Sequence, residues 1–200
     1  NYRGYDFMYI AIEGIDTAGK STQIAKLAKH FPEAIITKEP GATEIGKEIR
    51  DIVLSARTKS KKAEFLLFLA DRAEHMQEVI QPNLDKMIIS DRSAVSGVAY
   101  ALIQGEVSKE DLVSLNNFAT GNIYPQKVFL LRLTKKELDF RLSQKDLDGI
   151  ELRGSEYLLK IQNAIIEATK LLGLELVEID ATQSRNEITK NILNNIKDNQ

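Results

Sequence analysis

Short apolar runs alternate with longer amphipathic stretches along this chain, and the alternation predicts its elements. The apolar runs have the length of strands and fall at residues 9–13, 34–37, 87–90, 127–133 and 175–179. The amphipathic stretches have helical spacing and cover residues 20–30, 43–54, 61–81, 95–104, 109–120, 135–143, 155–172 and 185–196. Strands that alternate with helices favour an α/β fold, here a five-stranded parallel sheet with helices on both faces.

The length of the chain suits one domain with a lid. We expect this domain to cover residues 8–200, with a short lid at about residues 143–154. Residues 1–7 are polar and aromatic without a period, so they are expected to be a remnant of expression or a short extension before a natural start at Met8. In a parallel sheet, ligands bind beyond the carboxyl ends of the strands, so the chemistry is expected directly after each apolar run.

Composition excludes several classes of function. The chain is 43% hydrophobic and 28% charged, as is usual for a soluble globular domain. Its net charge of −2 argues against a protein that grips a nucleic-acid backbone. The absence of Cys excludes disulfides, thiolate metal sites and thiol catalysis. No apolar run reaches the ~20 residues of a membrane span, and no signal peptide is visible, so we expect a cytoplasmic protein with no membrane partner.

The strongest motif is a phosphate loop after the first apolar run. It comprises Gly14-Ile15-Asp16-Thr17-Ala18-Gly19-Lys20-Ser21-Thr22, which fits the pattern G-x-x-x-x-G-K-S/T. The two glycines let the backbone turn tightly and bring its amides close to phosphate oxygens. Lys20 supplies positive charge for the β- and γ-phosphates, and Ser21 offers a hydroxyl to Mg²⁺. The helix that follows directs the positive end of its dipole at the anion.

Polar residues also follow the second and third apolar runs. Residues 38–43 contain a Pro-Gly turn signal, and Thr43 is suited to cap the next helix, so this stretch also fits a simple connector. Asp91 follows the third run, where an acidic residue beside a phosphate loop orients Mg²⁺ or its waters. Arg92 would clamp an acceptor phosphate. The alternative for this pair is an ordinary loop ion pair.

Phe68 and Arg72 lie four residues apart and therefore share one face of a predicted helix. An aromatic ring beside a guanidinium group would hold a nucleobase by stacking and hydrogen bonding. Judged without the rest of the chain, this pattern favours the alternative, in which Phe68 packs in the core and Arg72 is solvated.

Residues 146–154 are charged, contain two glycines and separate two helical patterns. In an enzyme that transfers phosphoryl groups, such a mobile connector is where a lid would lie. The candidate lid cations, in or beside this stretch, are Arg141, Lys145 and Arg153. The alternative is a solvated loop.

Further stretches match one known family in order and spacing. They are Lys38-Glu39-Pro40-Gly41, Leu66-Leu67-Phe68-Leu69-Ala70-Asp71-Arg72-Ala73, Ser90-Asp91-Arg92, Ala99-Tyr100, Asn116 with Ala119-Thr120-Gly121, and Ile179-Asp180-Ala181. With the phosphate loop, they make nearly the whole chain from Met8 resemble bacterial thymidylate kinase, a family of P-loop nucleoside-monophosphate kinases. The resemblance implies transfer of the γ-phosphoryl group of ATP to dTMP, giving dTDP and ADP for dTTP synthesis, with Mg²⁺ and in a homodimer.

The resemblance also implies roles for the matching residues. The phosphate loop would hold ATP and Mg²⁺, with Asp91 near the metal, and Ala181 would flank the adenine. The implied dTMP contacts are Asp16 at the 3′-hydroxyl, Glu39 and Arg92 around the acceptor phosphate, Phe68 stacked on thymine, Arg72 hydrogen-bonded to the base, and Tyr100 under the sugar. The family's lid favours Arg141 as the fixed catalytic cation, with Lys145 or Arg153 in support.

Three positions depart from the family's pattern. Ser93 stands where an aromatic residue or His is usual. Gly97 stands where a polar residue often reads the base, so that contact is lost, replaced by Ser96 or made by water. Gly149 stands where a lid arginine is common. Since Thr17 is not basic either, the lid must supply any second cation.

Three alternatives have other functions. A GTPase-type switch is suggested by residues 134–137, which resemble the guanine-reading T-K-x-D, but Glu137 replaces the Asp. A non-catalytic nucleotide sensor would use the same phosphate loop. A kinase for another nucleoside monophosphate would share the fold and the chemistry.

Overall fold

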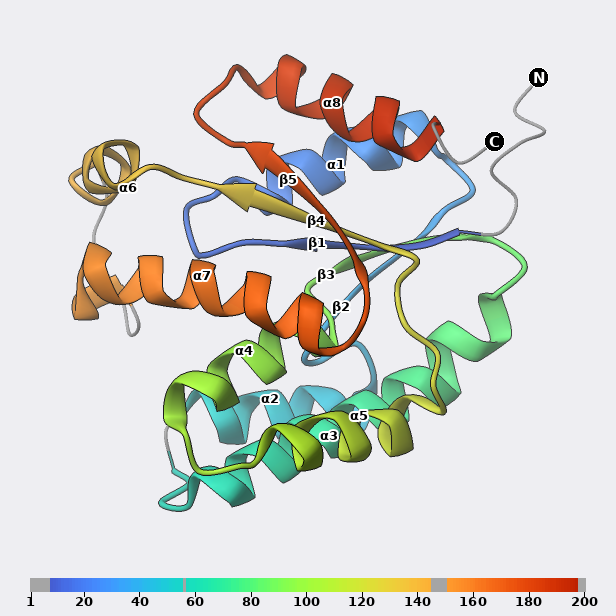
Figure 1. Cartoon of the computed structure of the whole chain (residues 1–200). Helices are drawn as coiled ribbons and strands as arrows, with labels where there is room; N and C mark the ends of the chain where they lie inside the picture. The colour runs from blue at the N-terminus through green and yellow to red at the C-terminus, as the bar shows by residue number, and fades with distance from the viewer. Residues whose placement is uncertain (1–7, 56, 145–150, 198–200) are drawn as a thin grey trace.

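Five parallel strands form the sheet of this computed structural model, which describes residues 8–55, 57–144 and 151–197 (Figure 1). The strands are β1 (Met8–Glu13), β2 (Ile35–Lys38), β3 (Met87–Asp91), β4 (Lys127–Arg132) and β5 (Glu175–Asp180). They lie in the order β2-β3-β1-β4-β5, and every pairing is parallel. Each strand begins and ends within one residue of its predicted run, which confirms the expected fold class.

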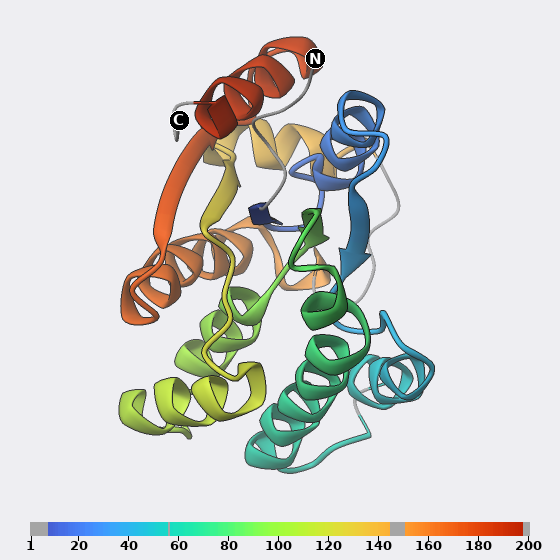
Figure 2. The ribbon, with the colours of Figure 1, turned by 90° about the vertical axis from the view of Figure 1, so that its right-hand side faces the viewer.

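Helices cover both faces of the sheet. They are α1 (Lys20–His30), α2 (Glu44–Leu54), α3 (Lys61–His75), α4 (Ala94–Gln104), α5 (Lys109–Thr120), α6 (Lys135–Leu142), α7 (Ser155–Leu171) and α8 (Arg185–Lys197). Helices α1 and α8 lie on one face and α4 and α7 on the other, with α2, α3 and α5 side by side beyond them (Figures 1 and 2). Within the described ranges, no helix has the length and apolar character that crossing a membrane requires.

Hydroxyl side chains set the start of six of these helices. Each accepts a hydrogen bond from a backbone amide of the first turn, which would otherwise have no partner. The capping residues are Thr43, Ser60, Ser93, Ser108, Thr134 and Ser184. The local sequence therefore fixes these helix boundaries.

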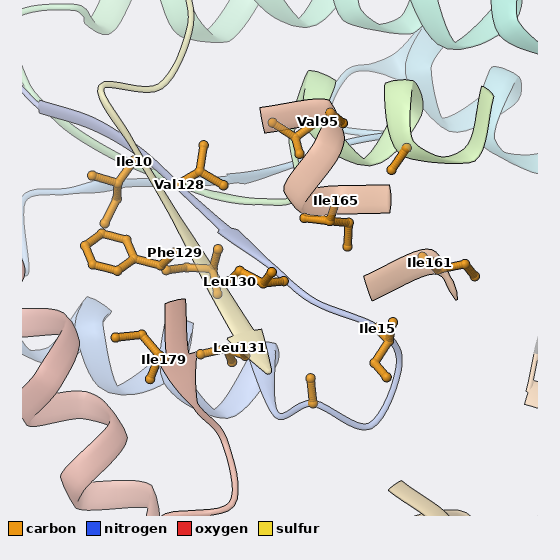
Figure 3. Packing of buried hydrophobic residues seen from close by; sticks show 14 of the residues in the cluster. Ile10, Ile15, Val95, Val128, Phe129, Leu130, Leu131, Ile161, Ile165 and Ile179 are labelled. Carbon is orange, nitrogen blue, oxygen red and sulfur yellow. The ribbon is translucent and has the colours of Figure 1, made fainter. Parts of the chain in front are cut away.

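The core lies between the sheet and its helices. Ile10, Val128 and Phe129 are fully buried, and their side chains pack with Ile165 of α7 and Ile179 of β5 in one cluster (Figure 3). Because helices cover both faces of the sheet, the three inner strands, β1, β3 and β4, are buried at consecutive positions instead of alternating positions.

The helix predicted over residues 61–81 is helical throughout, but it is not a single α-helix. The α-helix ends at His75, continues as a π-helical turn, η1 (Met76–Ile80), and ends as a 3₁₀ turn, η2 (Gln81–Asn83). Pro82 has no amide hydrogen, and in an α-helix its ring would collide with the carbonyl group four residues earlier. Apolar spacing does not report this change, because the buried positions continue through it.

The carboxyl ends of β1, β2 and β3 lie level with one another. Asp91 pairs with Ile12 on one side and with Lys38 on the other. Beyond the strands, the Glu39 amide donates to the Asp91 carbonyl oxygen at 3.0 Å, and the Arg92 amide donates to the Ile12 carbonyl oxygen at 3.0 Å. The three loops that follow these strands are therefore brought to one edge of the sheet.

Asp71 ties α3 to the loop between β2 and α2. Its side chain is 2% exposed, and its Oδ1 atom accepts a hydrogen bond from the Gly41 amide at 2.9 Å. Burial raises the pKa of Asp71 to about 6; the hydrogen bond from Gly41 opposes this shift, and the charge on Glu39 adds a smaller rise. The folded protein thus holds this proton more tightly than the unfolded chain does. The resulting stabilisation is complete below the ordinary pKa of 3.8 and is lost as the pH rises through about 6.

Asp71→Asn should therefore be more stable than the wild type at pH 8, because the amide keeps the acceptor for Gly41 and carries no buried charge. The difference in unfolding free energy should grow by about 2 kcal/mol between pH 4 and pH 8, somewhat less than the full shift implies because the site borders solvent. Urea unfolding of both proteins across this range is the measurement. A difference that does not change with pH would contradict the raised pKa.

Candidate active site

A pocket of about 370 Å³ opens at the carboxyl edge of the sheet, between the phosphate loop, α3 and α4. It brings together predicted residues from four segments of the chain. They are Asp16, Lys20, Ser21, Glu39, Phe68, Arg72, Asp91, Arg92, Ser96, Gly97 and Tyr100. The rule that ligands bind beyond the strand ends therefore located the pocket correctly.

The phosphate loop follows β1, the central strand. Gly14 has a φ of 152°, and a Cβ atom there would lie 3.1 Å from the carbonyl oxygen of Leu131, so only glycine fits. The Lys20 ammonium group folds back over the loop and donates to the carbonyl oxygens of Gly14 at 3.0 Å and Ile15 at 3.4 Å. Burial, reinforced by Arg92, lowers the pKa of Lys20 to about 8. A bound phosphate would reverse this effect, because a nearby anion favours the charged ammonium.

Arg92 joins the phosphate loop to the start of α4. Its backbone has a φ of 67°, an uncommon value for a side chain of this size. Its Nη1 atom donates to the carbonyl oxygen of Gly14 and to Ser96 Oγ, both at 3.1 Å. Its Nη2 atom donates to Asp16 Oδ1 at 2.9 Å. Arg92 therefore forms its ion pair with the phosphate loop, and its guanidinium group lies in the pocket wall.

Glu13 is a buried carboxylate beneath this arrangement. It accepts hydrogen bonds from Ser93 Oγ at 2.9 Å and Ser96 Oγ at 2.5 Å. Burial raises the pKa of Glu13, and Arg92 and the two hydroxyls oppose the shift. The position of Ser93, where an aromatic residue or His was expected, thus has a structural reason: the hydroxyl satisfies Glu13 and also caps α4. Ser96 is engaged in the same way.

Arg72 is 2% exposed, so the alternative of a solvated arginine is wrong. Its Nε atom donates to Glu39 Oε2 at 2.9 Å, and its Nη1 atom donates to Asn116 Oδ1 at 2.8 Å. Burial disfavours the charge on Glu39, but Arg72 and His75 outweigh it and lower the pKa of that carboxyl. Phe68 is half-buried one turn before Arg72 and lines the same pocket. The two side chains thus stand together, as their spacing predicted.

Asp91 and Ser21 form the remaining polar corner of the pocket. Asp91 Oδ1 is buried and has no hydrogen-bond partner among the described residues. The described residues also contain no cluster of three or more His, Cys, Asp or Glu side chains that would hold a metal by themselves. One carboxylate and one hydroxyl suit Mg²⁺, which keeps several waters and binds through few protein ligands together with phosphates. The donor set therefore fits the expected metal.

Arg141 reaches the phosphate loop from α6. Its Nη1 atom donates to the Thr17 carbonyl oxygen at 2.9 Å, and its Nη2 atom donates to the Ala181 carbonyl oxygen at 2.7 Å. The guanidinium group of Arg153 instead lies over the ring of Tyr157, 4.4 Å from its centroid. The first seven residues, Lys145, Asp148 and Gly149 lie outside the described residues, and so does half of the predicted lid, residues 145–150.

The stretch that suggested a guanine-reading motif is the start of a helix. Thr134 caps α6 by accepting from the Glu137 amide at 3.3 Å. The Lys135 ammonium group pairs with Glu156 at 3.0 Å. Both side chains are thus engaged in local structure.

Sequence reasoning missed several residues of the pocket wall. They are Lys38, Pro40, Arg50, Val53, Leu54, Glu64 and Asp71. Arg50 donates to the Pro40 carbonyl oxygen at 3.0 Å, which holds its guanidinium group beside the loop after β2. Helical spacing could have found it, because Arg50 lies between the buried positions Gly46 and Val53 of α2.

Comparisons with known proteins agree with the fold. A family model described as thymidylate kinase matches residues 12–192. The thymidylate kinase of Sulfurimonas denitrificans is 75% identical over 189 residues, which cover 94% of this chain and 99% of that protein. The thymidylate kinase of Wolinella succinogenes is 56% identical over 181 residues, covering 90% and 94%.

A crystal structure of thymidylate kinase from Ehrlichia chaffeensis matches with a TM-score of 0.73, covering 95% of this chain and 98% of that one. Its sequence identity of 22% makes this a likeness of fold alone. The residues that the family model matches include the phosphate loop, the pocket wall and α6. The chain therefore belongs to the thymidylate kinase family.

Proposed function

We propose that this chain transfers the γ-phosphoryl group of ATP to dTMP, giving dTDP and ADP, and that the pocket residues divide the work as described below. The observation that carries the proposal is the placement of a phosphate loop and a Phe-Arg pair on two walls of one pocket. A nucleotide of fixed length would then have its phosphate at one end and its base at the other. The alternative acceptors are other nucleoside monophosphates.

At the phosphate end, the reaction needs positioning and neutralisation of charge. The acceptor is already an oxyanion, so no general base is required. Lys20 would contact the phosphates of ATP, and Arg92 would hold the acceptor phosphate. Glu39 supports this end from the loop after β2. Asp16 stands within 2.9 Å of Arg92, where it is suited to meet the 3′-hydroxyl of the sugar.

Mg²⁺ would be held by Ser21 and the Asp91 carboxylate together with phosphate oxygens and water. When bound, it neutralises charge on the transferring phosphoryl group. Support comes from Asp91 Oδ1, which is buried and lacks a protein partner within the described ranges. The backbone amides of the phosphate loop, residues 14–22, would bind the phosphate oxygens.

At the base end, Phe68 would stack on thymine and Arg72 would donate to it. Tyr100 lines the same pocket and would lie under the sugar. Ser96 is committed to Glu13 and Arg92, so we assign it to the site's support. Gly97 leaves the wall beside Arg72 open, with no side chain of its own to read the base.

We assign residues 8–200 to one kinase domain with a lid at about residues 143–154. Arg141 would be the fixed lid cation, because it already contacts the carbonyl oxygen of Thr17 in the phosphate loop. Ala181, which accepts from the same guanidinium group, would flank the adenine. Arg153 and Lys145 would contribute less, and Lys145 lies outside the described residues.

A homodimer is the proposed assembly. Exposed apolar side chains lie on the neighbouring helices α2, α3 and α5, where Ile45, Leu66 and Phe118 are 52%, 56% and 87% exposed. These helices lie side by side on the side away from the sheet (Figure 2). A second copy would cover such side chains. Sedimentation equilibrium measures the assembly directly, and a single monomeric species at micromolar concentration would contradict it.

The acceptor is tested by ADP release from ATP with dTMP, dUMP, UMP, dCMP and AMP in turn. We expect the largest kcat/KM with dTMP and no ATP consumption without an acceptor. A different preferred monophosphate would replace dTMP in the proposal. Turnover of GTP alone would favour a nucleotide switch, and no turnover at all would favour a sensor.

Phe68→Ala should weaken dTMP binding by roughly 1–3 kcal/mol, the range for loss of stacking between an aromatic side chain and a base. ATP binding should change little, because Phe68 lies at the other end of the pocket. Equilibrium titration of both ligands is the measurement. Leu84→Ala is the matched control, since Leu84 is also an apolar side chain but is 42% exposed and does not line the pocket. Equal losses for dTMP and ATP would show that Phe68 only supports the fold.

Arg141→Ala should lower kcat on the order of 10²-fold while the dissociation constant of dTMP stays nearly constant, because a lid cation acts on the transferring phosphoryl group. Arg153→Ala and Lys145→Ala should have milder effects. Single-turnover kinetics separates chemistry from product release. Arg132→Ala is the control, since Arg132 pairs with Glu178 at the surface. If Arg141→Ala keeps the kcat of the wild type, the guanidinium group is not catalytic.

A further inference from the structure

A chain of five buried side chains runs beneath the base end of the pocket. Thr37 Oγ1 lies 2.7 Å from His75 Nε2, and His75 Nδ1 lies 3.1 Å from Glu39 Oε1. Glu39 Oε2 then accepts from Arg72 Nε at 2.9 Å, and Arg72 Nη1 donates to Asn116 Oδ1 at 2.8 Å. The chain links the edge strand β2 to α3 and α5.

Because these side chains are buried, the loss of any one of their hydrogen bonds is costly. His75 and Asn116 are fully buried, and Arg72 and Glu39 are 2% and 5% exposed. Water therefore cannot replace a partner that is removed, and a buried charge that loses a partner is strongly disfavoured. The Glu39 carboxylate has two oxygens in this chain, one for His75 and one for Arg72. If His75 no longer holds its oxygen, the carboxylate is free to turn, and the guanidinium group turns with it.

The guanidinium group has a defined free side. Its Nε and Nη1 atoms are used within the chain, which leaves Nη2. A Cβ atom on Gly97 would lie 3.0 Å from Nη2, so the absence of a side chain there keeps this nitrogen open to the pocket. A guanidinium N–H donates to the carbonyl oxygen at position 4 of thymine, and it has no acceptor in the amino group at position 4 of cytosine.

We propose that His75 is a positioning residue for base selection: it holds Glu39, and through Glu39 it holds Arg72 in the orientation that reads a carbonyl oxygen at position 4 of a pyrimidine. This inference rests on the proposed function. His75 itself is not part of the pocket lining, so it acts through the ion pair.

The position of His75 in α3 supports this role. Arg72 and His75 lie three residues apart, on one face of the helix, and both approach the same carboxylate. His75 is also the last residue of α3 before the π-helical turn η1. Such turns occur frequently at functional sites.

Two substitutions test the hydrogen bonds of the two ring nitrogens of His75 separately. The amide nitrogen of Asn takes the place of Nδ1, so His75→Asn keeps the bond to Glu39. The amide of Gln takes the place of Nε2, so His75→Gln keeps only the bond to Thr37. We expect His75→Gln to raise the KM for dTMP roughly tenfold and to reduce the preference for dTMP over dCMP by a similar factor, with kcat and the KM for ATP within about twofold. His75→Asn should keep the KM for dTMP and the preference for dTMP over dCMP close to the wild-type values.

Met76→Ala is the control for lost packing. Met76 is the next residue, is 2% exposed and packs in a separate apolar cluster with Ile80 and Ile88. It should leave the KM for dTMP and the preference over dCMP unchanged. An effect of Met76→Ala equal to that of His75→Gln would overturn the proposal, because packing would then explain both.

The remaining outcomes are also decisive. If the wild type does not phosphorylate dTMP, the proposed function fails. If it does, and His75→Gln keeps the KM and the preference of the wild type, only the role of His75 fails. Should His75→Gln not fold, Thr37→Val removes the hydroxyl behind Nε2 with little change of shape. We then expect about a threefold rise in the KM for dTMP, and an unchanged value would overturn the inference.

Discussion

The carboxyl ends of β1, β2 and β3 lie level with one another because the hydrogen bonds between parallel strands fix their register. Asp91 of β3 joins the three strands, since it pairs with Ile12 of β1 on one side and with Lys38 of β2 on the other. A slip of one residue in either pairing would turn each side chain to the opposite face of the sheet. The phosphate loop, the loop with Glu39 and the start of α4 would then no longer face one pocket.

This edge of the sheet holds several buried charges, and two of its carboxylates are matched by partners. Glu39 is matched by Arg72 and His75, and Glu13 by Arg92 and two serine hydroxyls. Buried pairs of this kind contribute little net stability, because the loss of hydration offsets their attraction. What they provide is orientation. Lys20 shows the same balance: burial lowers its pKa, and the phosphates of a nucleotide would favour its charged form.

Two residues that depart from the family's pattern have structural roles that a sequence motif does not show. Ser93 has a structural role that a motif does not report, because its hydroxyl joins the buried carboxylate of Glu13 to the cap of α4. Gly97 is a site where a missing side chain exposes the Nη2 atom of Arg72. In both cases, the residue acts through a neighbour that lies elsewhere in the sequence. The effect of a substitution at such a position can therefore be interpreted only when the contacts of the residue in the structure are known.

The sequence alone determined the five strands, most of the helices and the phosphate loop, because each depends on nearby residues: apolar spacing, hydroxyl caps and two glycines. It also placed Phe68 and Arg72 on one helix face. It did not reveal that Arg72 is buried, that His75 contacts Glu39, or that Arg141 reaches Thr17, 124 residues away in the chain. Only the tertiary structure decided these contacts, since a hydropathy pattern shows which side chains are polar but not which of them folding removes from water. Once buried, such a side chain must find its partner on another element, and the packing of the elements determines which one it meets.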